Sequence, residues 1–114
     1  MKRILIIYPH WPPSNLAGVH RSRLIANFSR DFGWDVTVLT VHEKHYEETL
    51  DFEIEKLVAP HIEVIKCDAS PVKKILGRRV IGDIGIRGWR SMKSSMLALL
   101  EKRPFDFIWI PIPS

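Results

Sequence analysis

The sequence predicts an α/β fold, a Rossmann-like three-layer domain with a parallel sheet. Its strand candidates are runs of β-branched and aliphatic residues with apolar side chains toward both faces, as in parallel sheets. Helical patterns separate these runs, which is the order of a βαβ fold. Proline and glycine stand where the segments change. With 114 residues, of which 46% are hydrophobic, the chain is long enough for one such domain.

The first strand is predicted at residues 3–8, RILIIY. Pro9, Pro12 and Pro13 end it, because proline has no backbone N–H for a sheet ladder. Gly18 then precedes a helical pattern. In doubly wound folds the ligand lies outside the carboxyl end of the strand, and the free N–H groups of the next helix attract anions. We therefore expect the rest of the chain to be arranged around the sheet edge at which this strand ends.

The first helix is predicted from residue 18 or 19 to residue 31. Leu24, Ile25 and Phe28 can share one apolar face of it. Gly33 follows, where a helix end often needs a left-handed residue. The helix and its two flanking strands then make a right-handed crossover.

The remaining elements follow from the same patterns. Further strands are predicted at residues 36–40, 62–66 and 105–110. The strand at 62–66 alternates more, which favours a place near the sheet edge. A polar segment at 41–49 should lie at the same edge as the proline loop. Helices are predicted at 50–58 and from Ser91 to the proline at 104, with a long amphipathic loop that holds short helical pieces at 68–88.

Several classes of site are not expected. Cys67 is the only cysteine, so no intrachain disulfide can form, and we interpret it as a buried apolar residue. His42 and His45 have no convincing metal-ligand spacing with the nearby glutamates, so no metal is assigned. No secretory signal or membrane-spanning run is recognised, and we expect a cytoplasmic protein.

At this point the residues support a family resemblance. The supporting segments are the strand at 3–8, the proline loop reaching Gly18, RSRLIANF at 21–28, FGWDVTVLT at 32–40 and FDFIWI at 105–110. In order and spacing, the chain resembles the N-terminal domain of a family 4 glycosyltransferase of the GT-B fold. Residues 1–114 would then be the acceptor-side domain, and we expect them to be a fragment of a longer protein that lacks the C-terminal donor domain.

The resemblance implies an enzyme that transfers a hexose from a nucleotide diphosphate sugar to a glycan or lipid-linked acceptor, in envelope polysaccharide or glycoconjugate synthesis. The sugar nucleotide is a co-substrate, and no other cofactor is implied. The fragment alone is expected to be inactive, because the donor domain carries the paired-glutamate motif. Many members have two adjacent glycines where this chain has Ala17 and Gly18. The alternative is a non-catalytic Rossmann-like domain that binds a nucleotide or a partner.

Candidate site residues lie around the first loop. Ala17 and Gly18 form the candidate donor-phosphate loop, although a turn glycine is the plain alternative. Candidate anion or acceptor contacts are Ser14, Asn15, Arg21, Arg23, His10 and Trp11. Arginine can hold phosphate through two hydrogen bonds, and each of these residues also has an ordinary structural interpretation. Trp11, for example, could stack on an acceptor or simply cover the loop.

A basic segment is the second functional signal. Residues 71–103 hold nine Lys or Arg and two Asp or Glu, whereas the whole chain has a net charge of +4. The candidate contacts to an anionic membrane surface or to the acceptor are Lys73, Lys74, Arg78, Arg79, Arg87 and Arg90. The location would then be peripheral, on the inner face of the cell membrane. A solvated basic loop is the alternative, and nucleic acid is not expected because aromatic residues are not interleaved with the cations.

Overall fold

The structure is a computed structural model that describes residues 2–14, 16–46, 50–69, 74–75, 78–79 and 88–110. Helices are labelled α, 3₁₀-helices η and strands β. The elements are β1 (Lys2–Ile7), α1 (Ala17–Ser29), η1 (Arg30–Phe32), β2 (Trp34–Val41), η2 (Glu43–His45), η3 (Phe52–Leu57), β3 (Glu63–Cys67), β4 (Lys74–Ile75), β5 (Arg78–Arg79), α3 (Trp89–Lys102) and β6 (Phe107–Trp109).

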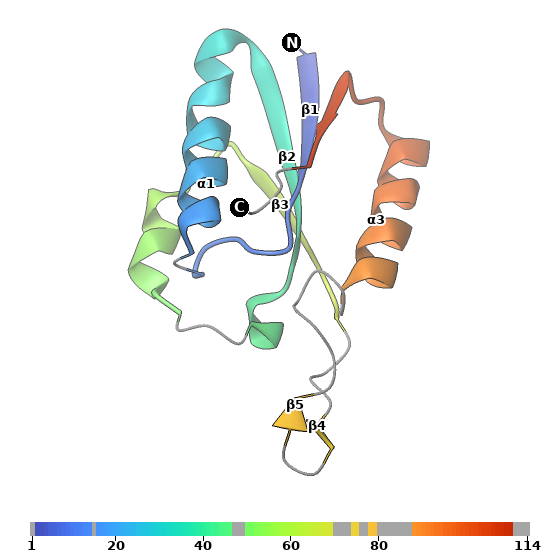
Figure 1. The fold of residues 1–114 in the computed structure, drawn as a ribbon. Coiled ribbons are helices and arrows are strands. Elements are labelled where there is room, and N and C mark those ends of the chain that lie inside the picture. Colours follow the sequence, from blue (N-terminus) through green and yellow to red (C-terminus); the bar gives the residue numbers. More distant parts are fainter. Residues whose placement is uncertain are drawn as a thin grey trace.

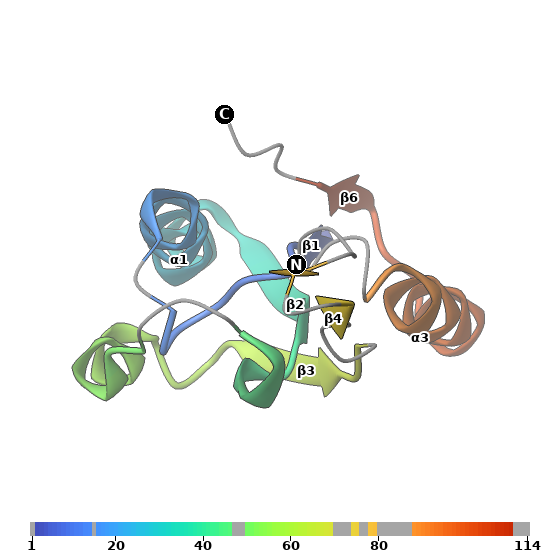
Figure 2. The ribbon, with the colours of Figure 1, turned by 60° about the horizontal axis from the view of Figure 1, so that its bottom comes forward.

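Four strands form one parallel sheet in the order β3-β2-β1-β6. Ile6 of β1 is in register with Val38 of β2 on one side and with Trp109 of β6 on the other. The predicted parallel α/β architecture is confirmed, and so is the edge position of β3. Helix α1 lies on one face of the sheet and α3 on the other (Figures 1 and 2).

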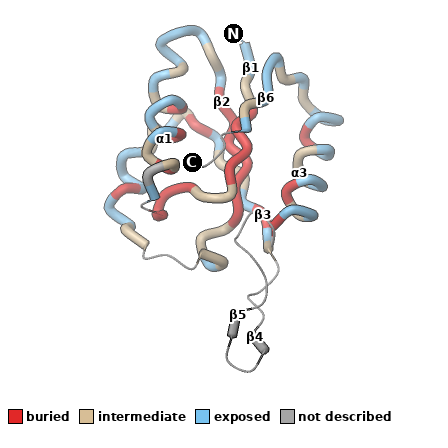
Figure 3. The backbone as a smooth tube through the Cα atoms, viewed as in Figure 1, coloured by how far each residue is buried: buried red, intermediate tan, exposed pale blue. Residues whose placement is uncertain are grey.

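Successive residues of a strand point to opposite faces, so the sheet has a core on each side. Buried residues concentrate along the central strands (Figure 3). On the α3 face, Leu5 of β1 packs in one cluster with Met92 and Leu99. On the α1 face, Ile6 packs in a second cluster with Ala26. Burial on both faces explains why β1 has no polar alternation.

Helix α1 differs from the prediction in the face that it buries. Val19, Ser22 and Ala26 are fully buried against the sheet. The residues expected on its apolar face stay largely exposed, namely Leu24 at 46%, Ile25 at 42% and Phe28 at 56%. Small side chains at positions 22 and 26 allow the helix to lie close to the sheet. Apolar periodicity alone could not reveal this, because helix α1 is apolar on more than one side.

The other helical segments also differ in detail. The predicted helix at 50–58 is the 3₁₀-helix η3, in which Ile54 is the buried residue. Helix α3 begins at Trp89, two residues before the expected start. Within 68–88, the described residues 74–75 and 78–79 form the antiparallel pair β4 and β5 rather than helical pieces; most of the rest of this prediction lies outside the described residues.

Two further expectations are settled by the structure. Gly33 has a φ of 83°, the left-handed conformation predicted after the first helix. Cys67 is buried at the end of β3. In the part of the chain that the structure describes, no helix has both the length and the apolar character needed to cross a bilayer.

Candidate functional site

The candidate site lies at the carboxyl edge of the parallel sheet. Helix α1 connects β1 to β2 and lies on one face of the sheet. Helix α3, which comes after β3 and before β6 in the chain, lies on the other face (Figure 2). The direction of strand order therefore reverses between β1 and β6. Ligands of open α/β sheets bind outside the carboxyl ends of the strands at such a reversal.

Tyr46 joins two loops at this edge. Its hydroxyl donates a hydrogen bond of 2.7 Å to the Val41 carbonyl and accepts one of 2.9 Å from the Trp11 backbone N–H. Ser14 and Leu50 also form an antiparallel bridge between the same loops. The prediction that segment 41–49 lies at the same edge of the sheet as the proline loop is thus confirmed for its described part. Our sequence reasoning missed Tyr46, although it is the only Phe, Tyr or Trp in this polar segment.

The N-terminus of α1 opens onto the same edge and carries positive charge. Its N-cap residue Leu16 makes no side-chain capping hydrogen bond, and the first turn holds no acidic residue. His20, Arg21 and Arg23 follow within two turns, with Arg23 Nη2 lying 3.5 Å from His20 Nδ1. Cations near a helix N-terminus are unfavourable unless an anion offsets them. The N–H groups at this end of α1 and the two arginines are groups of the kind that can bind an anion.

Gly18 also has a structural reason to be glycine. A Cβ atom built there would lie 2.2 Å from the hydroxyl oxygen of Tyr8. Tyr8 is itself almost fully buried, so it has little room to move. Close packing of α1 on Tyr8 therefore accounts for the glycine without a ligand, and the phosphate role of Ala17 and Gly18 stays a prediction.

The other loop residues predicted as contacts lie in different environments. Trp11 and Ser14 are buried, and Trp11 packs in the core cluster on the α1 face. The ring of His10 lies between the rings of Tyr8 and Tyr46, at centroid distances of 5.9 and 5.3 Å. The structure therefore favours a covering role for Trp11 over stacking on an acceptor. Asn15 lies outside the described residues.

The predicted basic segment is described only in part. Arg90 is exposed in the first turn of α3, and the backbones of Lys74, Arg78 and Arg79 belong to β4 and β5. Lys73 and Arg87 lie outside the described residues. At the start of α3, Lys93 Nζ lies 5.9 Å from the ring centroid of Trp89. These two side chains border an apolar groove of about 280 Å³ whose other lining residues are Ile7, Pro9, Met92, Met96 and Ile110.

Charged pairs connect the ends of β2 and β3. Lys66 Nζ donates a hydrogen bond of 2.7 Å to Glu43, and Asp68 contacts both His45 and Lys44 at 3.2 and 3.3 Å. Burial opposes ionisation of Glu43, but the hydrogen bond and charge of Lys66 lower its pKa overall. Within the described ranges, no three His, Cys, Asp or Glu residues are grouped to hold a metal ion.

Glu43→Gln is expected to weaken the dependence of stability on acid pH. The pKa of Glu43 is lower in the folded chain than its ordinary value of 4.5. The stability that Glu43 contributes is therefore fully present above the ordinary pKa and is lost as the pH falls through the lower pKa of the folded chain. Urea unfolding between about pH 6 and 3 should show a smaller loss of stability in the variant. An unchanged pH profile would contradict the assignment.

Comparisons with known proteins assign this chain to no family. No protein-family model matches the chain, and searches of curated proteins and of solved structures also find no match. The fold and the edge geometry define an α/β domain of the Rossmann-like type with a four-stranded parallel sheet. Its function must be argued from the residues at the carboxyl edge.

Proposed function

We propose that this chain is the acceptor-side domain of a glycosyltransferase with the GT-B fold, similar to family 4. The complete enzyme would transfer a hexose from a nucleotide diphosphate sugar to a hydroxyl group of a glycan or lipid-linked acceptor. The domain described here would supply one wall of the active-site cleft. A second α/β domain would bind most of the donor.

The observation that carries this proposal is the uncapped N-terminus of α1 at the reversal of strand order. The first turn of α1 has no acidic residue, and Arg21 and Arg23 follow in the second turn. Preorganised N–H groups and arginines can offset the negative charge that develops on a leaving diphosphate. Such a site needs no metal ion for that purpose.

The acceptor would approach from the α3 side of the same edge. The apolar groove beside Trp89 suits the apolar part of a lipid-linked sugar, and the ammonium group of Lys93 suits its phosphate. This assignment gives the two helix N-termini separate tasks. Helix α1 faces the donor diphosphate, and α3 faces the acceptor or the membrane.

Nucleotide titration tests the donor part of the proposal. UDP or GDP added to isotope-labelled protein should shift the backbone amide resonances of Gly18 and Val19. Arg21→Gln combined with Arg23→Gln should weaken this binding about tenfold, the effect of one lost charge-assisted hydrogen bond. Arg30→Gln is the matched control, since it removes the same type of charge beyond the opposite end of α1.

Three results separate the alternatives. The donor-site assignment is wrong if neither nucleotide shifts these resonances, or if the Arg30 variant weakens binding as much as the double variant does. Binding without any transfer activity, even after a donor domain is joined to the chain, would favour a non-catalytic nucleotide-binding domain. Reading the gene beyond codon 114 for a paired-glutamate α/β domain gives an independent check.

A further inference from the structure

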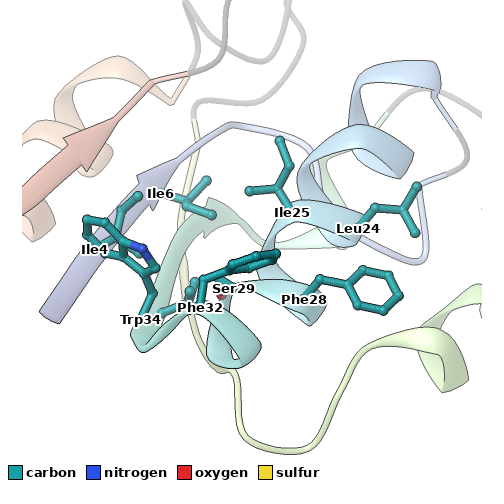
Figure 4. Close-up of a pocket in the computed structure, with 9 residues that line it drawn as sticks. Ile4, Ile6, Leu24, Ile25, Phe28, Ser29, Phe32 and Trp34 are labelled. Atoms are coloured by element: carbon teal, nitrogen blue, oxygen red, sulfur yellow. The ribbon is translucent and has the colours of Figure 1, made fainter. Parts of the chain in front are cut away.

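The segments around the parallel sheet are held to it by two different kinds of contact. Helix α1 buries Ala26 in an apolar core cluster. The groove along its flank is also apolar, with Ile25, Phe28 and Phe32 among the residues that line it (Figure 4). Residues 42–46, which follow β2, differ: their 3₁₀-helix η2 has no buried residue, and charged side chains connect it to the end of β3. We refer to residues 42–46 as the strap.

The strap ends at Tyr46, which contacts the proline loop directly. The Tyr46 hydroxyl accepts a hydrogen bond of 2.9 Å from the Trp11 N–H and donates one of 2.7 Å to the Val41 carbonyl. The Tyr46 ring also lies beside the ring of His10, at a centroid distance of 5.3 Å. One side chain of the strap therefore contacts two successive residues of the loop, His10 and Trp11.

Two sets of charged contacts hold the strap to β3. Near the start of the strap, Lys66 Nζ lies 2.7 Å from a Glu43 carboxylate oxygen, and these side chains are 32% and 19% exposed. Near its end, Asp68 contacts His45 and Lys44, and the Asp68 side chain is 76% exposed. Hydrogen bonds with these two residues lower the pKa of Asp68, which favours its ionised form.

Backbone hydrogen bonds add less to this attachment. Within the strap, two of them, each 3.0 Å long, close the single turn of η2. At its start, the His42 N–H donates one of 2.9 Å to the Cys67 carbonyl. A single turn of 3₁₀-helix is marginal on its own, and salt weakens exposed ion pairs by screening them. The attachment of the strap to the sheet therefore depends largely on charge.

We propose that the strap holds the proline loop through charge, with Glu43 and Asp68 acting as positioning residues for Tyr46. Screening or removing these two carboxylates then loosens the Tyr46 hydroxyl from the Trp11 N–H. The strap lies at the carboxyl edge of the sheet, so salt concentration alters the geometry of that edge. No bound nucleotide is needed, so this proposal does not rest on the proposed function.

Hydrogen exchange of the Trp11 backbone amide tests the strap in the isotope-labelled chain. Tyr46→Phe removes the hydroxyl and should speed this exchange about tenfold, the effect of one lost hydrogen bond. Glu43→Gln combined with Asp68→Asn should speed it about fivefold, because the ion pairs of both carboxylates are lost. The Val38 amide, in the inner strand β2, reports opening of the sheet itself. A loosened strap should therefore accelerate Trp11 and leave Val38 unchanged.

Sodium chloride provides a readout that a purely packing role of these residues would not change. About 1 M salt reduces the Debye length to about 3 Å and should accelerate Trp11 exchange in the wild-type chain as the double variant does. In the double variant, the same salt should have little further effect. Glu63→Gln is the matched control, because it removes a carboxylate that pairs with Arg103 at the start of β3. It should leave Trp11 exchange unchanged.

Four results would overturn the proposal. The first is unchanged Trp11 exchange in Tyr46→Phe. The second is a normal rate in the double variant when Tyr46→Phe is fast, since the carboxylates would then not position Tyr46. The third is equal acceleration of Trp11 and Val38, which would indicate general loss of stability. The last is an effect of salt or of Glu63→Gln that does not depend on the strap carboxylates.

Discussion

Gly18→Ala is expected to destabilise the protein by about 1–3 kcal/mol, the usual effect of overpacking a tight contact. The same substitution inside a helix ordinarily stabilises by up to about 1 kcal/mol, so the expected sign is the reverse of the general rule. The reason is the Tyr8 hydroxyl oxygen, which would lie 2.2 Å from the new methyl carbon. Urea unfolding followed by circular dichroism measures the change.

Tyr8→Phe provides the matching test of this steric argument. Without the hydroxyl, the nearest atom to the added carbon is the ring carbon that carried it, at 3.1 Å. The clash is then reduced but not abolished. The double variant Gly18→Ala/Tyr8→Phe should therefore be more stable than the sum of the two single effects predicts. Residues in contact show such coupling in a double-mutant cycle.

The same experiment distinguishes two explanations of Gly18. If glycine is needed only so that a phosphate can approach the backbone, Gly18→Ala should keep or raise stability and reduce nucleotide binding alone. If the contact with Tyr8 matters, stability should fall in the absence of any nucleotide. Additive single effects in the Tyr8 cycle would contradict the steric explanation.

The sheet could be predicted from the sequence because its signals are local. Each predicted strand is a short apolar run bounded by proline, glycine or polar residues, and a parallel sheet buries both faces of such strands. The left-handed Gly33 was predictable for the same reason, since a helix end and a following strand bracket it. The choice of buried face on α1 was not local. It depends on Ser22 and Ala26 fitting against strands that are adjacent only after folding.

The sequence predicts where the candidate site lies, but not how its residues contact one another. The order of strand, proline loop and helix places Gly18 at the carboxyl edge of the sheet. The sequence does not show that Tyr8 lies under Gly18, because a loop of nine residues separates them. Nor does it show that the Tyr46 hydroxyl holds the Trp11 backbone, a contact between residues 35 positions apart. Such contacts depend on how loops meet, which periodicity does not encode.

Trp11→Ala is expected to have the largest effect on stability of any change proposed for this chain, about 3–5 kcal/mol. Trp11 is only 2% exposed and packs with Ile6 and Ala26 in the core cluster on the α1 face. Truncation removes a large apolar side chain and leaves a cavity beneath the proline loop. Since a domain is stable by roughly 5–15 kcal/mol in total, urea unfolding should show a much lower midpoint.

Trp89→Ala is the control for this prediction, because it makes the same substitution at a tryptophan that is 62% exposed. Its effect on stability should stay within about 0.5 kcal/mol. The contrast separates two roles for tryptophan at one edge of the sheet. Trp11 fixes the loop that precedes α1, and Trp89 offers an aromatic surface to solvent or to a ligand. Equal losses of stability would mean that Trp89 packs in the fold as Trp11 does, and it would then be a poor candidate for acceptor or membrane contact.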